Sequence, residues 1–370
     1  AKRVAVVDIG SNSARMVIYE KTSRYAFHLL HEEKSRVRIS ENAYKHQGNL
    51  QEIPMQRAFE ALKDFVDITK SFQVSKILCV ATSALRDAPN KKDFLKKVKD
   101  NLKLQIRVID GEKEAYYGAI ACLNLLPKLE SALSIDIGGG STEFSFINSK
   151  DISNTVSLDI GTVRLKELYC DNNDLSHAIE YIDENLKFLD DVKISTLVGI
   201  GGTFRALSSA IMEKNNYPFN KLHAYQYEAK VFKKFISKIL EADESELLNL
   251  GIKENRFDVI KPGALILERV LKKISATDVV TSGVGVREGV YLCDLLRTSK
   301  DKFPHNYNTS VKHILDSYVD DKTYSNQLSL LSKKVFDLTS DYLNIEKEYR
   351  YELSLAAKLY PSGSNIHFYS

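Results

Sequence analysis

Two apolar stretches, each followed by a glycine-bearing turn and a second apolar stretch, open the two halves of the chain. The first pair covers residues 1–9 and 15–19, and the second pair covers residues 132–137 and 143–147. Short apolar runs bounded by glycine and hydroxyl residues are typical of β-strands joined in hairpins. The repetition predicts two related halves, each of which begins with a β-hairpin.

Helical and strand patterns alternate through the rest of the first 300 residues. Predicted helices cover residues 55–71, 91–102, 113–126 and 174–189, another begins at Thr203, and predicted strands cover residues 76–81, 106–109 and 196–200. Beyond this region the pattern is helical, as in residues 311–319 and 328–343. We therefore predict an α/β fold with a first domain over residues 1–125, a second over 126–300 and a helical extension over 301–370.

Composition narrows the class of protein. A chain of 370 residues usually needs more than one hydrophobic core, which favours two domains with a cleft between them. The 52 basic residues nearly balance the 49 acidic residues, so the chain is not expected to bind nucleic acid or a membrane surface, and any anion site must be local. No stretch is long and apolar enough to cross a membrane and no secretory signal is evident, so we expect a cytoplasmic protein.

Cysteine and histidine spacing gives no sign of a transition-metal site. The four cysteines contain no CxxC pair, and the eight histidines contain neither an HxH nor an HExxH pattern. The sequence therefore predicts neither a disulfide framework nor a zinc site, and the thiols are expected to be reduced and mostly buried.

The first glycine turn follows the first predicted strand. It contains Asp8, Gly10, Ser11, Asn12 and Ser13. Glycine permits close backbone approach to a ligand, while hydroxyl, amide and N–H groups can converge on phosphate oxygens. Taken alone, however, this stretch is better explained as an ordinary hairpin turn.

The second glycine turn, residues 136–143, is more informative. Its candidate phosphate ligands are Gly138, Gly139, Gly140, Ser141 and Thr142. Three consecutive glycines lose much backbone entropy without adding packing, so a bound ligand is favoured over a merely flexible turn. The flanking carboxylates of Asp136 and Glu143 predict a hard cation held with its waters beside a phosphate, and Asp8 is a third candidate ligand.

Several segments, in this order, resemble the Ppx/GppA family of exopolyphosphatases and guanosine pentaphosphate phosphatases. They are residues 8–15 (Asp-Ile-Gly-Ser-Asn-Ser-Ala-Arg), 81–86 (Ala-Thr-Ser-Ala-Leu-Arg), 111–115 (Gly-Glu-Lys-Glu-Ala), 136–143, 157–165, 199–203 and 287–289. The resemblance covers about residues 1–300. It implies two actin-like domains of ribonuclease H-like fold that flank a phosphate cleft, with Mg²⁺ as the cofactor.

The resemblance also implies roles for single residues. Glu114, the glutamate just before the alanine of residues 111–115, would position the attacking water, because hydrolysis of a phosphoanhydride needs a group that orients or deprotonates water. Arg86 is expected to clamp the terminal phosphate. Further candidates for substrate binding are Arg15, Arg164, Gly202 and Arg287. For Arg15 and Arg164, a solvated strand residue is an equally good interpretation.

The predicted function is exophosphohydrolysis. The enzyme would remove the terminal phosphate of inorganic polyphosphate, or the 5′ γ-phosphate of guanosine pentaphosphate to give the tetraphosphate, with water directed by Glu114. A non-catalytic sensor of alarmones or nucleotides and an actin-like kinase are the alternatives. The expected partners are polyphosphate or guanosine penta- or tetraphosphate, and a homodimer is left open.

The last part of the sequence resembles the beginning of the helical HD-like domain found in longer family members. Within residues 352–363, Tyr360 and Pro361 stand where that resemblance predicts a histidine-acid pair. We interpret residues 301–370 as a truncated or degenerate form of this domain, without an HD metal site and without a catalytic role.

Overall fold

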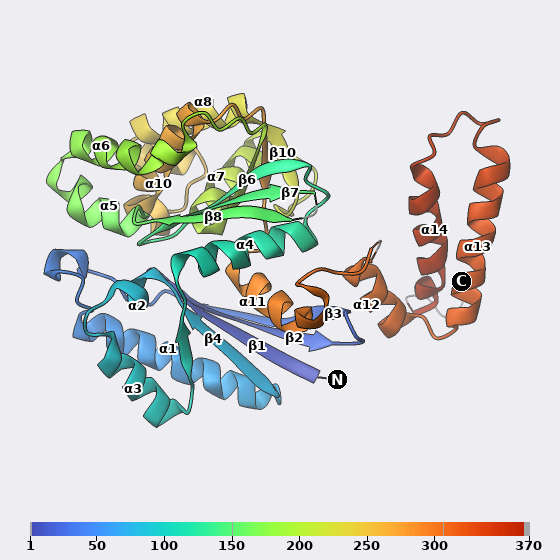
Figure 1. Cartoon of the computed structure of the whole chain (residues 1–370), viewed down its shortest axis with the longest axis horizontal. Helices are drawn as coiled ribbons and strands as arrows, with labels where there is room; N and C mark the ends of the chain where they lie inside the picture. Colours follow the sequence, from blue (N-terminus) through green and yellow to red (C-terminus); the bar gives the residue numbers. More distant parts are fainter. Residues whose placement is uncertain (1, 150, 306, 366–370) are drawn as a thin grey trace. The chain divides into compact units, whose positions relative to one another are not determined.

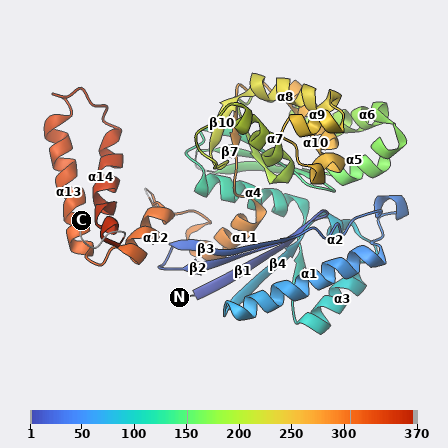
Figure 2. The same ribbon diagram turned by 180° about the vertical axis from the view of Figure 1, so that it is seen from behind.

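The apolar strands of the N-terminal third form a five-stranded sheet in the order β3-β2-β1-β4-β5. The computed structural model describes residues 2–149, 151–305 and 307–365. The strands of this sheet are β1 (Lys2–Ile9), β2 (Ala14–Lys21), β3 (Phe27–Ser35), β4 (Lys76–Ala81) and β5 (Ile106–Val108). Helices α1 (Glu52–Ser71) and α3 (Lys91–Leu102) cover one of its faces (Figures 1 and 2), where Leu62 and Phe65 are buried.

A second, six-stranded sheet has the order β10-β11-β9-β6-β7-β8. Its strands are β6 (Ser131–Ile137), β7 (Thr142–Asn148), β8 (Ile152–Leu158), β9 (Thr196–Ile200), β10 (Tyr225–Glu228) and β11 (Asp278–Thr281). β6 pairs antiparallel with β7 and parallel with β9, so that Asp136 lies opposite Glu143 on one side and Ile200 on the other. The register therefore brings the second glycine turn beside the end of β9.

Helices surround the second sheet and enclose its core. They are α5 (Thr162–Leu168), α6 (Leu175–Asn185), α7 (Gly201–Lys214), α8 (Ala229–Glu241), α9 (Glu244–Asn249) and α10 (Phe257–Lys273). Phe144, Phe204 and Phe232 are fully buried there, and the rings of Phe204 and Phe232 lie 4.9 Å apart. Aromatic burial of this kind is a large part of what stabilises such a core.

Helix α4 (Gly111–Leu125) runs between the two sheets (Figures 1 and 2) and packs against α11 (Val286–Leu295), β7 and β8. The Asp110 side chain caps α4 by accepting a hydrogen bond from the Lys113 amide at 2.7 Å. At the crossing with α11, a Cβ added to Gly289 would overlap the backbone carbonyl of Tyr117. A glycine therefore allows the two helix backbones to approach closely.

The chain divides into a larger and a smaller compact unit. The larger unit consists of Ala5–Val17 and Glu32–Lys302, and the smaller one of Ala1–Val4, Ile18–His31 and Phe303–Ser370. In the smaller unit, α13 (Lys322–Thr339) and α14 (Tyr349–Leu359) pack together as a helical hairpin after α12 (Thr309–Tyr318). The chain then forms a 3₁₀ turn over Tyr360–Asn365, which contains the two residues that replace the expected histidine-acid pair.

The predicted fold class is confirmed, since two α/β sheet regions precede a helical segment. Both predicted hairpins are present, and β4, α3 and β9 match their predicted ranges. The boundaries proposed at residues 125/126 and 300/301 stay predictions, and residues 366–370 of the proposed extension lie outside the described residues.

The boundaries of several predicted helices differ from expectation. α1 and α4 begin at Glu52 and Gly111 instead of residues 55 and 113, and α12 covers Thr309–Tyr318 instead of residues 311–319. α7 begins at Gly201 instead of Thr203, because Gly201 adopts a left-handed φ of +81° that lets the helix start directly after β9. α6 gives way to a 3₁₀ turn at Leu186–Leu189, and α13 lies several residues earlier in the chain than predicted.

Two further expectations can be compared with the described residues. None of the helices described is both long enough and apolar enough to span a membrane. The four cysteines are all free thiols in the described chain, with Cys79 and Cys122 buried.

Gly289→Ala is predicted to destabilise the protein. Alanine at a helical glycine normally stabilises by about 0.5–1 kcal/mol, but overlap with a backbone carbonyl cannot be relieved by a side-chain rotation and should cost about 1–3 kcal/mol or more. Chemical denaturation of wild type and variant measures the difference. Gly363→Ala is the matched control, since no atom of the described chain lies within 4 Å of its added Cβ. Equal stability of the two variants would contradict the tight crossing.

Candidate active site

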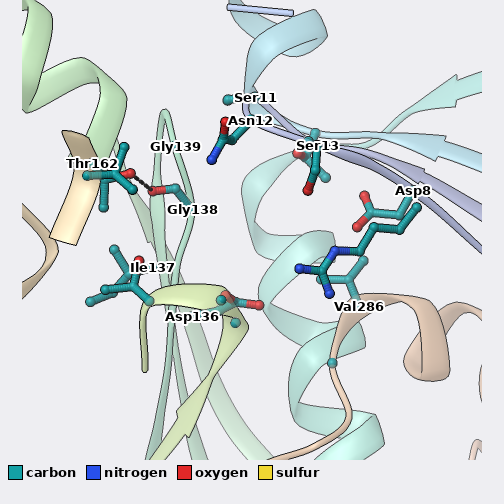
Figure 3. A pocket seen from close by; sticks show the side chains of 18 of the residues that line it. Asp8, Ser11, Asn12, Ser13, Asp136, Ile137, Gly138, Gly139, Thr162 and Val286 are labelled. Atoms are coloured by element: carbon teal, nitrogen blue, oxygen red, sulfur yellow. Dashed lines mark hydrogen bonds between the residues drawn. The ribbon is translucent and has the colours of Figure 1, made fainter. Parts of the chain in front are cut away.

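A cavity of about 170 Å³ lies where the two glycine turns meet. The predicted site residues that line it are Asp8, Gly10, Ser11, Asn12, Ser13, Arg15, Glu114, Asp136, Gly138, Gly139, Gly202 and Arg287. In Figure 3, the carboxylates of Asp8 and Asp136 point into the space between the turns. The structure thus brings together residues from segments that are far apart in the sequence.

The two turns are in direct contact through glycine. A Cβ added to Gly139 would lie 2.6 Å from the Cβ of Ser11, and one added to Gly140 would lie 2.8 Å from the Ser83 hydroxyl. On the other side, the amide of Thr162 donates to the Gly138 carbonyl at 3.0 Å, and its hydroxyl does so at 3.4 Å (dashed line in Figure 3). The sequence predicts a bound ligand as the reason for the glycine run, and close packing is a second physical reason for it.

Glu114 lies in the first turn of α4 and is only 8% exposed. Its Oε2 accepts a hydrogen bond from Nη1 of Arg86 at 3.0 Å. Burial raises the pKa of Glu114 well above its ordinary range, the nearby Glu143 raises it further, and Arg86 opposes the shift. A buried carboxylate with a perturbed pKa at the wall of a cavity is a candidate for acid-base chemistry.

Six predicted site residues do not line the cavity but lie behind it: Arg86, Gly140, Ser141, Thr142, Glu143 and Arg164. Arg86 is the penultimate residue of the short helix α2 (Ser83–Asp87) and is paired with Glu114. The Arg164 side chain donates a hydrogen bond from Nε to the Gly140 carbonyl at 2.8 Å and another from Nη2 to the Asp87 carboxylate at 2.7 Å. Arg164 therefore ties the second turn to α2, and the phosphate-binding roles of Arg86 and Arg164 stay predictions.

Glu143 also lies behind the cavity. It is buried in β7 and accepts a hydrogen bond from the Ser157 hydroxyl at 2.9 Å. Burial raises the pKa of Glu143 to about 8. Its position next to Glu114 means that the two carboxylates disfavour each other's ionisation. The role of Glu143 as a metal ligand stays a prediction.

Two carboxylates at the cavity itself fit a magnesium ion. Asp8 Oδ1 is buried and has no hydrogen-bond partner in the part of the chain that the structure describes. Asp136 lies beside Gly201, where an added Cβ would overlap its Oδ1, and burial raises the pKa of Asp136 to about 6. Over the described ranges, no three acidic, histidine or cysteine side chains form a metal cage. Magnesium does not need one, because it commonly takes one or two carboxylates together with water and substrate phosphate.

Four basic residues that the sequence analysis did not select also line the cavity: Lys34, Arg36, Arg205 and Arg256. Lys34 is in β3, a strand that the sequence analysis did not predict, and Arg36 follows it directly. Arg205 lies two residues beyond the segment 199–203 that was recognised, so extending that segment would have found it. No sequence motif marks Arg256, because this residue reaches the cavity only through the packing of α10.

Comparison with known proteins identifies the family. The sequence pattern of the Ppx/GppA phosphatase family matches residues 17–298, which is more than half of the chain. The chain belongs to the Ppx/GppA phosphatase family. The resemblance found in the sequence is thereby confirmed.

Two related proteins agree with this assignment. The chain is 31% identical to the bifunctional 3-dehydroquinate synthase/phosphatase of Fusobacterium nucleatum over 296 residues, which cover 75% of this chain but only 44% of that protein. It is 26% identical to the guanosine-5′-triphosphate,3′-diphosphate pyrophosphatase of Photobacterium profundum over 379 residues, which cover 98% of this chain and 73% of that protein. The chain thus spans less than half the length of the first of these relatives.

A solved structure shows the same fold. The exopolyphosphatase of Cytophaga hutchinsonii superposes with a TM-score of 0.73 at 27% sequence identity, and the match covers 80% of this chain and 98% of that one. The two sheets of this Ppx/GppA chain therefore share the α/β fold of that exopolyphosphatase.

Glu114→Gln is predicted to become more stable relative to wild type as the pH rises. The folded-state pKa of Glu114 is raised, so ionising this carboxyl in the folded protein costs free energy above the unfolded pKa, and the cost grows until the folded pKa is passed. Glutamine keeps the shape and has no such cost. Urea denaturation at several pH values without added metal measures the difference, and a difference that is constant with pH would contradict the raised pKa.

Proposed function

We propose that this protein is a phosphohydrolase that releases the terminal phosphate of an oligophosphate. The substrate is inorganic polyphosphate, the 5′ γ-phosphate of guanosine pentaphosphate, or both. The observation that carries the proposal is the buried Glu114–Arg86 pair at the wall of a cavity lined by two phosphate-type turns. Membership in a phosphatase family favours hydrolysis over the kinase alternative.

The charge of the cavity supports an anionic substrate. Burial, together with the nearby positive charges of Arg287 and Arg205, lowers the pKa of Arg15 to about 10. Arg287 is buried and pairs with Glu32 at 2.8 Å. A bound phosphate would offset this positive charge and would accept hydrogen bonds from arginine, which suits phosphate geometry.

Asp8 and Asp136 would hold the magnesium ion. Phosphatases of this family depend in general on a divalent metal. When bound, Mg²⁺ would neutralise charge on the phosphate oxygens and favour departure of the leaving phosphate. The two carboxylates lie on opposite turns, so each would orient the cation or its waters from a different side.

Glu114 would act on the attacking water. Its carboxylate orients the water toward the terminal phosphorus and accepts a proton as the new O–P bond forms. The bridging P–O bond breaks at the same time, and its electron pair leaves on the shortened phosphate chain. Arg86 favours the ionised form of Glu114 at the start of this step, because it donates a hydrogen bond to the carboxylate.

A purely sensing protein would need the phosphate turns but not a buried general base. Burying an ionisable group lowers the stability of the folded protein. Such a group is therefore expected mainly where it contributes to catalysis or binding. Glu114 at the cavity wall therefore favours the enzyme over the sensor. Polyphosphate and guanosine phosphates are the proposed partners.

Glu114→Gln is predicted to lower kcat by about a hundredfold to ten-thousandfold while the affinity for substrate changes little, because the amide cannot accept the proton. Phosphate release from polyphosphate and from guanosine pentaphosphate, with magnesium, measures turnover, and calorimetry measures binding. Glu112→Gln is the matched control, since Glu112 is exposed in the same helical turn. Near wild-type turnover by Glu114→Gln would remove Glu114 from the proposed role.

Asp136→Asn is predicted to raise the magnesium concentration needed for half-maximal activity by about tenfold, because an amide is a weaker ligand than a carboxylate for a hard cation. Titration of activity with Mg²⁺ tests this. Glu143→Gln should have a smaller effect, since Glu143 lies behind the cavity, and Asp100→Asn on exposed α3 controls for loss of a surface carboxylate. An unchanged magnesium requirement in Asp136→Asn would place the metal elsewhere.

A further inference from the structure

Helix α5 holds the second glycine turn through backbone hydrogen bonds. The amides of Val163 and Arg164 both donate to the Gly139 carbonyl, at 2.8 Å and 3.0 Å. The amide of Thr162 donates to the neighbouring carbonyl of Gly138 in the same way. The first turn of α5 is thus bonded to two successive carbonyls of the glycine turn, so any shift of this helix would move the turn with it.

The other end of α5 is fixed to the first half of the chain by one buried carboxylate. Glu167 is only 7% exposed, and it accepts hydrogen bonds from the backbone amides of Asn42 at 2.8 Å and Tyr44 at 3.1 Å. Both amides lie in the segment 36–51, which joins β3 to α1. Burial raises the pKa of Glu167, and the two amides oppose this shift. A carboxylate held by two backbone N–H groups fixes the position of both segments.

The side chain of Tyr44 continues from this joint to the second glycine turn. A Cβ added to Gly140 would overlap the Tyr44 hydroxyl, so the hydroxyl lies directly against the turn. The guanidinium of Arg164 lies 4.8 Å from the centre of the Tyr44 ring, and its Nε donates to the Gly140 carbonyl. Glu167 therefore reaches the turn by two routes, through the helix α5 and through the side chain of Tyr44.

A second ionic joint connects the same two segments without fixing their geometry. Asp171 is exposed and accepts hydrogen bonds from Lys45 at 2.8 Å and from Lys166 at 2.6 Å. Both partners are long, flexible side chains, and exposed ion pairs of this kind contribute little. Two carboxylates thus join α5 to the segment 36–51, and of these two Glu167 is the one that is bonded to backbone.

The joint at Glu167 determines how the proposed reacting groups lie relative to one another. Asp8 and Glu114 belong to the first half of the chain, whereas Asp136 directly precedes the second glycine turn. Catalysis of phosphoryl transfer depends almost entirely on positioning and electrostatic stabilisation. A misplacement of about 1 Å can lower a rate about a hundredfold. A residue that fixes the second turn against the first half can therefore control turnover without contact to the substrate.

We propose that Glu167 is a positioning residue for hydrolysis, which holds the second glycine turn in register with the first half of the chain. Tyr44 assists it through its contact with Gly140. This inference rests on the proposed phosphohydrolase function. Glu167 and Tyr44 do not line the cavity, so both act through the turn and not on the substrate.

The decisive experiment compares Glu167→Gln with Asp171→Asn. Glutamine keeps the size of the side chain, but its NH₂ group faces a backbone N–H, so one of the two hydrogen bonds is lost. Asp171→Asn removes a carboxylate between the same two segments and is the matched control. Phosphate release from long-chain polyphosphate and from guanosine pentaphosphate, with saturating Mg²⁺ and well below the unfolding temperature, gives kcat and KM. Hydrogen exchange followed by mass spectrometry reports the mobility of peptides that cover residues 41–46 and 136–143.

Glu167→Gln should lower kcat about tenfold and change KM less than about twofold, because the positioning of the reacting groups is lost while the groups that bind substrate remain. Amides in residues 41–46 and 136–143 should exchange faster than in the wild type. Asp171→Asn should leave both kcat and exchange near their wild-type values. Tyr44→Phe should lower kcat by a smaller factor, since this variant keeps the joint and loses the hydroxyl contact to Gly140.

Three results would contradict the proposals in different ways. Lower stability of Glu167→Gln with unchanged kcat and unchanged exchange in residues 136–143 would overturn the positioning role and leave a purely structural anchor. If Glu167→Gln does not fold, an unchanged kcat of Tyr44→Phe would overturn it instead. Absence of phosphate release by the wild type would overturn the proposed hydrolase, and the exchange measurements would still decide whether Glu167 fixes the turn.

Discussion

The close approach of two glycine turns from different sheets is the constraint on which the site depends. Gly139 leaves no room for a Cβ against Ser11, and Gly161 leaves none against the backbone of Gly139. Because the turns touch, Asp8 at the end of β1 and Asp136 at the end of β6 face the same small cavity. The crossing of α4 and α11 at Gly289 repeats this principle and brings Glu114 to the same place. Backbone proximity, which only glycine allows, therefore assembles the chemistry.

This arrangement concentrates buried charge, which costs stability. Burial raises the pKa of Asp8, Glu114, Asp136 and Glu143, so each carboxylate is harder to ionise in the folded protein than in water. The ion pair between Arg86 and Glu114 offsets part of this cost. A bound cation would offset more of it, and a phosphate chain would offset the positive charge of the arginines and the lysine that line the cavity. Ligands of both kinds would therefore stabilise the folded protein as they bind.

Local patterns in the sequence predicted many of the elements, although not β3, and the residues that neighbour each other along the chain. Both hairpins, the α4 helix and the pairing of the two glycine turns across one cavity follow from local patterns and from the family resemblance. Residues that enter the site by packing alone could not be predicted in this way. Lys34 reaches the cavity from a strand with no clear alternation, and Arg256 does so because α10 begins beside Gly202. Tertiary packing, which no single segment encodes, decided both positions.

The surroundings of Arg86 likewise depend on tertiary packing. An arginine that follows a strand in a family-like segment suggests a phosphate clamp, and that role stays a prediction; in the structure its guanidinium donates to Glu114 at 3.0 Å and does not line the cavity. This hydrogen bond favours the ionised form of Glu114, against burial and the nearby Glu143, which raise the pKa of the carboxyl. In the proposed mechanism, a phosphate that enters the cavity would bring negative charge toward Glu114 and raise this pKa further, which would make Glu114 a stronger base. Arg86 would oppose that shift, so the ion pair would link the charge of the substrate to the strength of the proposed base.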